Sequence, residues 1–158
     1  MHETLSIINK DIRPAAQSSS STGRAGEKLA AEFLVKNGFR IMLANFKVPI
    51  GRNTLDVSVS GEIDIIAADE NILSFVEVKT RRSDSFGGPL SAVDLRKQRQ
   101  ITRTARVYLK IFGIRQVPYR FDVVTVVLIK DNDPKVELIK GFWSEQKFRK
   151  KAWRGDIF

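Results

Sequence analysis

The sequence predicts an α/β fold, in which helices flank a central mixed β-sheet. Two observations carry this prediction. Alternating or β-branched runs at 61–80 and 119–129 indicate strands, whereas apolar residues at helical spacing within 24–37 and 91–112 indicate helices. A chain of 158 residues suits one domain with a sizeable core.

The first part of the chain is expected to hold an extension, a helix and a strand. A polar, serine-rich tract closes 1–22, which predicts a flexible extension before a domain at 23–143. The helix at 24–37 should end at the following glycine, and a strand should occupy 39–48. The next stretch, 49–60, reads as a turn followed by an exposed strand.

The middle of the chain carries the clearest strand signals. Strands at 61–68 and 72–80 flank a polar Asp-Glu-Asn triplet, which predicts a hairpin turn. A polar loop should then lead to the helix at 91–112, where Ser91 and Asp94 resemble a capping box.

The C-terminal part is predicted to complete the sheet. The β-branched run at 119–129 indicates a central strand, and 136–142 indicates an edge strand. The tail at 144–158 mixes basic and aromatic residues, so it either grips nucleic acid by charge and stacking or docks on the domain by its aromatic side chains. The residues concerned are Trp143, Lys147, Phe148, Arg149, Lys150, Lys151, Trp153 and Arg154.

Charge and composition limit the classes of function. The 27 Lys and Arg against 18 Asp and Glu leave a formal net charge of +9, so nucleic acid is the expected partner class; the alternative is a basic protein without such a partner. The absence of cysteine excludes disulfides and thiolate metal sites, and a lone histidine, His2, argues against a histidine-based catalytic triad. No apolar run reaches the roughly 18 residues of a membrane span, and the N-terminus lacks a signal-peptide pattern. We therefore expect a cytoplasmic protein without membrane contacts.

Charged residues interrupt the two clearest strands in a regular pattern. Because side chains alternate along a strand, Glu62 and Asp64 should share one face, and Glu77 and Lys79 should share one face of the next strand. The intervening apolar side chains are expected on the opposite faces: Ile63 with Ile65, and Val76 with Val78.

Pairing of these strands across the short turn would bring Asp64 and Glu77 together. Two carboxylates in a partly dry place repel each other, and a divalent cation relieves the repulsion. Hard oxygen ligands favour Mg²⁺ or Mn²⁺ over zinc. Lys79 would then hold a scissile phosphate or help to deprotonate a water, which completes the parts needed for phosphodiester hydrolysis. The alternative is a simple salt bridge of the carboxylates with Lys79 or an arginine on a solvated face.

The second helix carries a basic face. From Arg96 to Arg120 there are eight basic residues and no acidic one. At about 100° per residue one stripe suits a row of phosphates, although an ordinary solvated face is the alternative. The stripe comprises Arg96, Arg99, Arg103, Arg106 and Lys110. The opposite, apolar side should pack on the sheet through Ile101, Ala105, Tyr108, Leu109 and Phe112.

Several ordered blocks resemble a known family. Asp64 followed by Glu77-Val78-Lys79 is similar to the PD-(D/E)xK signature of restriction-endonuclease-like nucleases, and Glu27 in the first helix is similar to a glutamate of archaeal Holliday-junction resolvases. Together GRAGEKLAAEFLVKNGF, GEIDIIA, FVEVKTR, the Phe86-Gly87 loop and RFDVV resemble the YraN-like family, which comprises small bacterial proteins assigned to that superfamily. The resemblance covers roughly 23–127. Two features depart from the superfamily pattern: the residue before Asp64 is not proline, and the link before GEID is longer than usual.

The resemblance implies a restriction-endonuclease-like core. In that core Asp64 and Glu77 bind Mg²⁺ or Mn²⁺, the Val78 carbonyl completes the site and Lys79 assists catalysis. Glu27 would act through water or as a further ligand, the alternative being an exposed helix charge paired with an arginine.

Several further residues can be given a functional or a structural role. Nuclease relatives often have a glutamine on the helix after the E-x-K strand, which makes Gln98 a catalytic candidate; capping or burial against backbone is the alternative. Arg81 and Arg82 either contact the substrate backbone or are ordinary loop charges. A supporting role is expected for Glu62, and a structural ion pair for Asp122.

The function that follows is a metal-dependent endonuclease acting on DNA, branched or otherwise structured. The first alternative is a catalytically inactive nucleic-acid-binding module on the same fold, and the second is a basic protein whose partner is another protein. Resolvase-like members of this fold act as dimers, so a homodimer is considered, although the sequence identifies no dimer surface.

Overall fold

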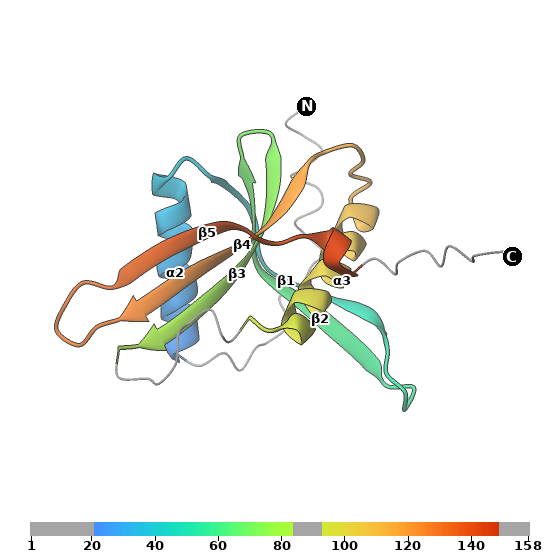
Figure 1. Cartoon of the computed structure of the whole chain (residues 1–158), viewed down its shortest axis with the longest axis horizontal. Helices are drawn as coiled ribbons and strands as arrows, with labels where there is room; N and C mark the ends of the chain where they lie inside the picture. The colour runs from blue at the N-terminus through green and yellow to red at the C-terminus, as the bar shows by residue number, and fades with distance from the viewer. Residues whose placement is uncertain (1–20, 84–92, 149–158) are drawn as a thin grey trace, which may run out of the picture.

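A computed structural model describes residues 21–83 and 93–148 of the chain. The described part forms a five-stranded sheet with two α-helices packed on it (Figure 1). This confirms the predicted α/β fold with a mixed sheet flanked by helices. The elements in chain order are α2 (Ser21–Lys36), β1 (Arg40–Arg52), β2 (Ser58–Asp69), β3 (Ile72–Arg82), α3 (Leu95–Ile111), β4 (Tyr119–Leu128), β5 (Lys135–Trp143) and the 3₁₀ helix η3 (Glu145–Phe148).

The sheet order follows the chain order, β1-β2-β3-β4-β5. Three neighbouring pairs are antiparallel, whereas β3 and β4 are parallel. A parallel pair needs a crossover, and the connection that contains α3 supplies it. The run at 119–129 is an inner strand as predicted, and β5 lies at an edge. Neither α2 nor α3 is both long and apolar enough to cross a membrane.

Each helix has its own cluster of buried residues on the sheet. The cluster of α3 includes Tyr108, whose ring meets Phe46 and Phe75 edge-on at centroid distances of 5.2 and 5.7 Å. The cluster of α2 joins Ala30 and Leu34 to valines of β3 and β4. The apolar sides predicted for both helices therefore face the sheet.

Element boundaries differ from the sequence-based expectations at both helices. Helix α2 begins at Ser21, before the expected start of the domain at 23. Helix α3 begins at Leu95, and Asp94 is its N-cap, accepting a hydrogen bond from the Lys97 N–H at 2.9 Å. The expected cap, Ser91, lies outside the described residues.

The β1–β2 hairpin is longer than predicted. Strand β1 continues to Arg52 and β2 begins at Ser58, so 49–52 is strand where the sequence suggested a turn. Figure 1 shows this hairpin projecting from the rest of the domain. The β2–β3 turn lies where predicted: Asp69 pairs with Ile72, and Glu70 takes the positive φ of 53° that a two-residue hairpin loop requires.

Strict alternation fails at one point of β2. Ile63 packs in the cluster under α3, whereas Ile65 packs in the cluster under α2, so the two do not share a face. The change occurs opposite Asn45 of β1, which has a positive φ of 53°. On β3 the alternation holds, because Val76 and Val78 both pack under α2.

Candidate active site

Two acidic side chains from adjacent inner strands lie close together, Glu77 buried and Asp64 half-buried. Glu77 of β3 is only 2% exposed, and its Oε2 has no hydrogen-bond partner within the described part of the chain. Asp64 of β2 accepts a hydrogen bond from the Val78 N–H at 2.8 Å. The structure thus brings Asp64 and Glu77 together, as the hairpin register predicted.

The electrostatics of this pair are unfavourable without a cation. Burial raises the pKa of Asp64 well above its usual range, and the Glu77 carboxylate raises it further; the Val78 N–H and the Lys97 ammonium act in the opposite direction. Burial and the nearby Glu62 also raise the pKa of Glu27. Negative charge is therefore concentrated where water is scarce.

Two lysines face these carboxylates. The Lys79 Nζ lies 2.9 Å from the Glu77 Oε1, and the Lys97 Nζ lies 3.6 Å from the same oxygen. The sequence predicted the first lysine and missed the second, which belongs to α3. The sequence could have identified Lys97 by one feature: it lies in the first turn of the helix that follows the E-x-K strand. Its position against Glu77 depends on how α3 crosses the sheet, which no local pattern specifies.

Gly26 places Glu27 beside the carboxylates. A Cβ on Gly26 would lie 1.7 Å from the Thr80 Oγ1, so only glycine lets α2 approach β3 this closely. The next residue, Glu27, interacts with both Glu77 and the side chain of Asn45. Glu27 therefore lies with Asp64 and Glu77 in what we call the carboxylate cluster, and is not the exposed charge of the alternative interpretation.

A second glycine positions Lys97 from the other helix. A Cβ on Gly61 of β2 would lie 1.9 Å from the Thr104 Oγ1 of α3. The same hydroxyl donates to the Gln100 carbonyl at 2.7 Å, which fixes its orientation. The first half of α3 is thereby held close to β2, and Lys97 reaches Glu77.

Gln98 has a different environment from the one expected of a catalytic residue. Its Nε2 donates to the Val93 carbonyl at 2.9 Å, and its Oε1 accepts from the Lys147 Nζ at 3.3 Å. It is buried, and its neighbour Lys97 is the residue that meets Glu77. The geometry thus matches the alternative of burial against backbone, while a catalytic role for Gln98 stays a prediction. Lys97 is a further candidate at this turn of the helix.

The oxygen donors of Asp64 and Glu77 fit a divalent cation. In 21–83 and 93–148, no three Asp, Glu or His side chains lie within reach of one metal ion. Mg²⁺ is usually held by one or two carboxylates and keeps several waters, so Asp64 and Glu77 are sufficient in number. The buried, unpartnered Oε2 of Glu77 and the all-oxygen chemistry of the pair fit such a hard cation. Participation of the Val78 carbonyl stays a prediction.

The basic stripe of α3 is exposed, but some of its members have partners. All five side chains face solvent. The Arg103 Nη2 donates to the Ile50 carbonyl at 2.6 Å, and the Arg99 guanidinium lies 5.7 Å from the Phe148 ring centroid. The Arg106 Nε lies 2.5 Å from the Glu145 Oε1.

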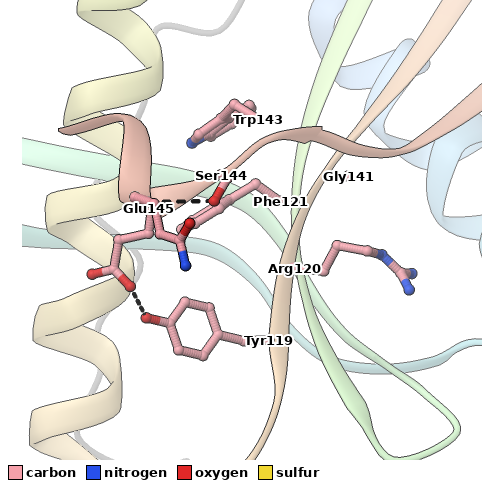
Figure 2. A pocket seen from close by; sticks show the side chains of 8 residues that line it. Tyr119, Arg120, Phe121, Gly141, Trp143, Ser144 and Glu145 are labelled. Atoms are coloured by element: carbon pink, nitrogen blue, oxygen red, sulfur yellow. Dashed lines mark hydrogen bonds between the residues drawn. The ribbon is translucent and has the colours of Figure 1, made fainter. Parts of the chain in front are cut away.

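Glu145 also connects the stripe to β4. Figure 2 shows the Tyr119 hydroxyl pointing at this carboxylate, to which it donates a hydrogen bond. Because Glu145 already neutralises Arg106, we expect that arginine to contribute less to phosphate binding than its neighbours. Tyr119 and Glu145 line the pocket in Figure 2, and the contacts of Glu145 join η3 to α3 and β4 beside it.

A basic groove lies between the first half of α3 and the β1–β2 hairpin. Five basic side chains and Asp94 contribute to its lining, and Lys79 and Lys97 belong both to the groove and to the carboxylate cluster. The other basic members are Arg96, Arg99 and Arg103. The groove therefore adjoins the carboxylates through Lys79 and Lys97.

The remaining candidates lie at the edges of the site or have structural partners. Arg81 and Arg82 are the last residues of β3, two and three positions beyond Lys79. Asp122 is fully buried and paired with Arg120 at 2.6 Å, as predicted for a structural ion pair. Trp143 is buried and its ring stacks on Phe121 at 4.9 Å, so it is core and not a surface for stacking bases.

The C-terminal tail is described only in part. Phe148 packs against the core under α3, which matches the docking alternative for this portion. The basic residues from Arg149 onward and Trp153 lie outside the described residues.

The fold and this cluster define an α/β domain whose inner strands hold a pair of carboxylates, one buried and one half-buried, beside two lysines. Residues 26–126 match the family described as Uncharacterised protein family UPF0102, and the chain belongs to this family. It is 44% identical over 118 residues to a UPF0102 protein of Desulfosudis oleivorans, an alignment that covers 75% of this chain and 85% of that protein. A UPF0102 protein of Symbiobacterium thermophilum is 43% identical over 122 residues, with coverage of 77% and 95%. Membership of an uncharacterised family is as expected, and the nuclease superfamily stays a prediction.

Proposed function

We propose that this protein is a divalent-cation-dependent endonuclease of the PD-(D/E)xK type that hydrolyses phosphodiester bonds in DNA. One observation carries the proposal: among the described residues none hydrogen-bonds to the Oε2 of the buried Glu77, which lies beside Asp64 and contacts two lysines of the basic groove. A purely structural cluster would gain nothing from leaving a buried carboxylate oxygen without a partner.

The residues would divide the work as follows. Asp64 and Glu77 would hold the cation, which when bound lowers the pKa of a water and neutralises phosphate charge. The Val78 N–H fixes the orientation of Asp64. Lys79 and Lys97 would contact the scissile phosphate and stabilise its added negative charge. Glu27 would orient a water or accept a proton from it, since burial and Glu62 raise its pKa.

The test is cleavage of single-stranded, duplex and branched DNA with Mg²⁺ or Mn²⁺. Asp64→Asn, Glu77→Gln and Lys79→Met are expected to abolish cleavage while the proteins remain folded. Glu137→Gln, at an exposed pair on β5, is the matched control and should cleave normally. Intact DNA under both metals with wild-type protein would overturn the proposal.

One observation favours the inactive binding module instead. The Glu77 Oε1 already contacts two lysine ammonium groups, which can balance the carboxylate without a metal. That function predicts salt-sensitive DNA binding that is unaffected by divalent cations or by Glu77→Gln. Metal-dependent cleavage separates the two functions directly.

A further inference from the structure

We infer that the tip of the β1–β2 hairpin, residues 53–57, is the element that selects the substrate. This inference rests on the proposed function. The tip would contact the faces of unstacked bases while phosphates of the same DNA lie in the basic groove. The protein would then prefer DNA with interrupted stacking, such as a fork or branch, to continuous duplex.

The tip is held in shape by its own residues. The Asn53 Oδ1 accepts hydrogen bonds from the N–H groups of Leu55 and Val57 at 2.9 and 3.0 Å. The Asn53 N–H donates to the Val57 carbonyl at 2.9 Å, and the Arg52 side chain donates to the Asp56 carbonyl at 2.7 Å. Leu55 is therefore presented by a preformed turn.

The base of the hairpin is fastened to the helix that forms the other wall of the groove. The Gln100 Nε2 donates to the Ser60 carbonyl at 3.0 Å, and Arg103 reaches the Ile50 carbonyl across the groove. At Gly51, which has a φ of 144°, an added Cβ would lie 2.7 Å from the Arg103 guanidinium. The hairpin thus keeps a fixed position relative to Lys97 and the groove.

The chemistry of the tip differs from that of the groove. Leu55 is 81% exposed and Val57 is 56% exposed, so two large apolar side chains face water within five residues. The groove beside them is lined mainly by cations, which suit phosphates. Apolar side chains can cover the face of a base only where that base is unstacked, because stacking in a continuous duplex covers the base faces.

The experiment compares binding to a forked duplex and to a continuous duplex of equal length, measured with EDTA so that binding is independent of cleavage. Wild type is expected to bind the fork roughly tenfold more tightly, within the range for one base contact. Leu55→Ser combined with Val57→Ser should bring this ratio close to one. Val35→Ser on α2 is the control, because Val35 has the same exposed fraction as Val57, 56%, and lies away from the hairpin.

The salt dependence of binding supplies an independent readout. The slope of log Kd against log salt reports phosphate contacts, so the hairpin variants should leave it unchanged. Equal wild-type affinity for the two DNAs would overturn the inference, as would an equal loss of affinity for both in the variants. Metal-dependent cleavage could still be observed in either case, which leaves the proposed function standing; absence of all DNA binding at low salt would overturn both.

Discussion

Burial and mutual repulsion govern Asp64 at the residue scale. Its pKa is raised above the ordinary value of 3.8, so the folded protein keeps this proton where the unfolded chain has released it. The contribution of Asp64 to stability is therefore greatest below pH 3.8 and falls as the pH rises through its folded-state pKa. The metal-free protein is therefore less stable at neutral pH than it would be with a neutral side chain at this position.

Asp64→Asn should therefore stabilise the metal-free protein at neutral pH by about 1–3 kcal/mol, since asparagine can still accept the Val78 hydrogen bond. Urea unfolding in EDTA across pH 4–8 measures this, and the variant should lose less stability than wild type as the pH rises. Asp69→Asn is the control of opposite sign: Lys140 and Arg120 lower the pKa of Asp69, so its removal should destabilise the protein near neutral pH. If Asp64→Asn lowered stability, the carboxylate repulsion would be excluded as the dominant effect.

Lys97 provides the second prediction at this scale. It lowers the pKa of Asp64 and contacts Glu77, so Lys97→Met should raise the pKa of Asp64 further, as followed by NMR titration of the side-chain carboxyl. Cleavage should fall by roughly 100-fold if the ammonium stabilises charge at the phosphate. Lys97→Arg should restore most of the activity, and Lys36→Met, at the exposed end of α2, should change neither quantity. An unchanged Asp64 pKa would remove Lys97 from the site.

At the scale of the elements, two close approaches of helix to sheet assemble the site. Gly26 lets α2 pack closely against β3, and Gly61 lets α3 pack closely against β2. The carboxylates belong to the strands, whereas Glu27 and Lys97 arrive with the helices. The position of each helix thus decides whether the cluster is complete.

Gly26→Ala is expected to destabilise the protein by about 1–3 kcal/mol, because α2 must move away from Thr80. The displacement should also weaken the coupling of Glu27 to Glu77. Thr80→Ala removes the Oγ1 and Cγ2 atoms, which would lie 1.7 and 2.7 Å from the new methyl group, and keeps the Cβ at 2.7 Å, so the double variant should recover only part of the loss. Chemical denaturation of the four proteins gives the coupling energy, and strictly additive losses would contradict the proposed contact.

Local patterns were sufficient for the strands and insufficient for the contacts between elements. Alternation placed Glu77 and Lys79 on one side of β3, and the polar triplet gave the β2–β3 turn. The sequence predicts a turn at 49–52, where the structure has strand, because Gly51 is typical of turns. In the fold, the glycine instead leaves room for the side chain of Arg103, which is far away in sequence. The sequence does not identify Lys97 for a similar reason: successive residues on a helix point about 100° apart, and only the packing of α3 on the sheet determines which side chain meets Glu77.

At the scale of the whole molecule, the net charge of +9 and the buried acidic cluster have opposite signs. The basic groove favours the approach of a polyanion, and the acidic cluster at its end favours a cation. The resemblance predicts a role for Glu27, and charge alone predicts only the class of partner. Both features were readable in the sequence, but their contact through Lys79 and Lys97 required the fold.

This arrangement couples cation binding to global stability. A cation that binds the folded state alone stabilises it by RT ln(1 + [L]/Kd), about 2.7 kcal/mol at one hundred times Kd. For a domain of this size each kcal/mol raises Tm by roughly 2–4 °C, so saturating Mn²⁺ should raise Tm by several degrees in differential scanning calorimetry.

The stabilisation by Mn²⁺ should depend on the carboxylates and on pH. Glu77→Gln should remove it, because the unpartnered oxygen is the one we assign to the cation, whereas Glu137→Gln on β5 should retain it. The effect should weaken as the pH falls below the raised pKa of Asp64, since the proton and the cation compete for the same carboxylate. A Tm that rises equally in Glu77→Gln and in wild type would show that Mn²⁺ binds elsewhere, and the assignment of the cation to Asp64 and Glu77 would be wrong.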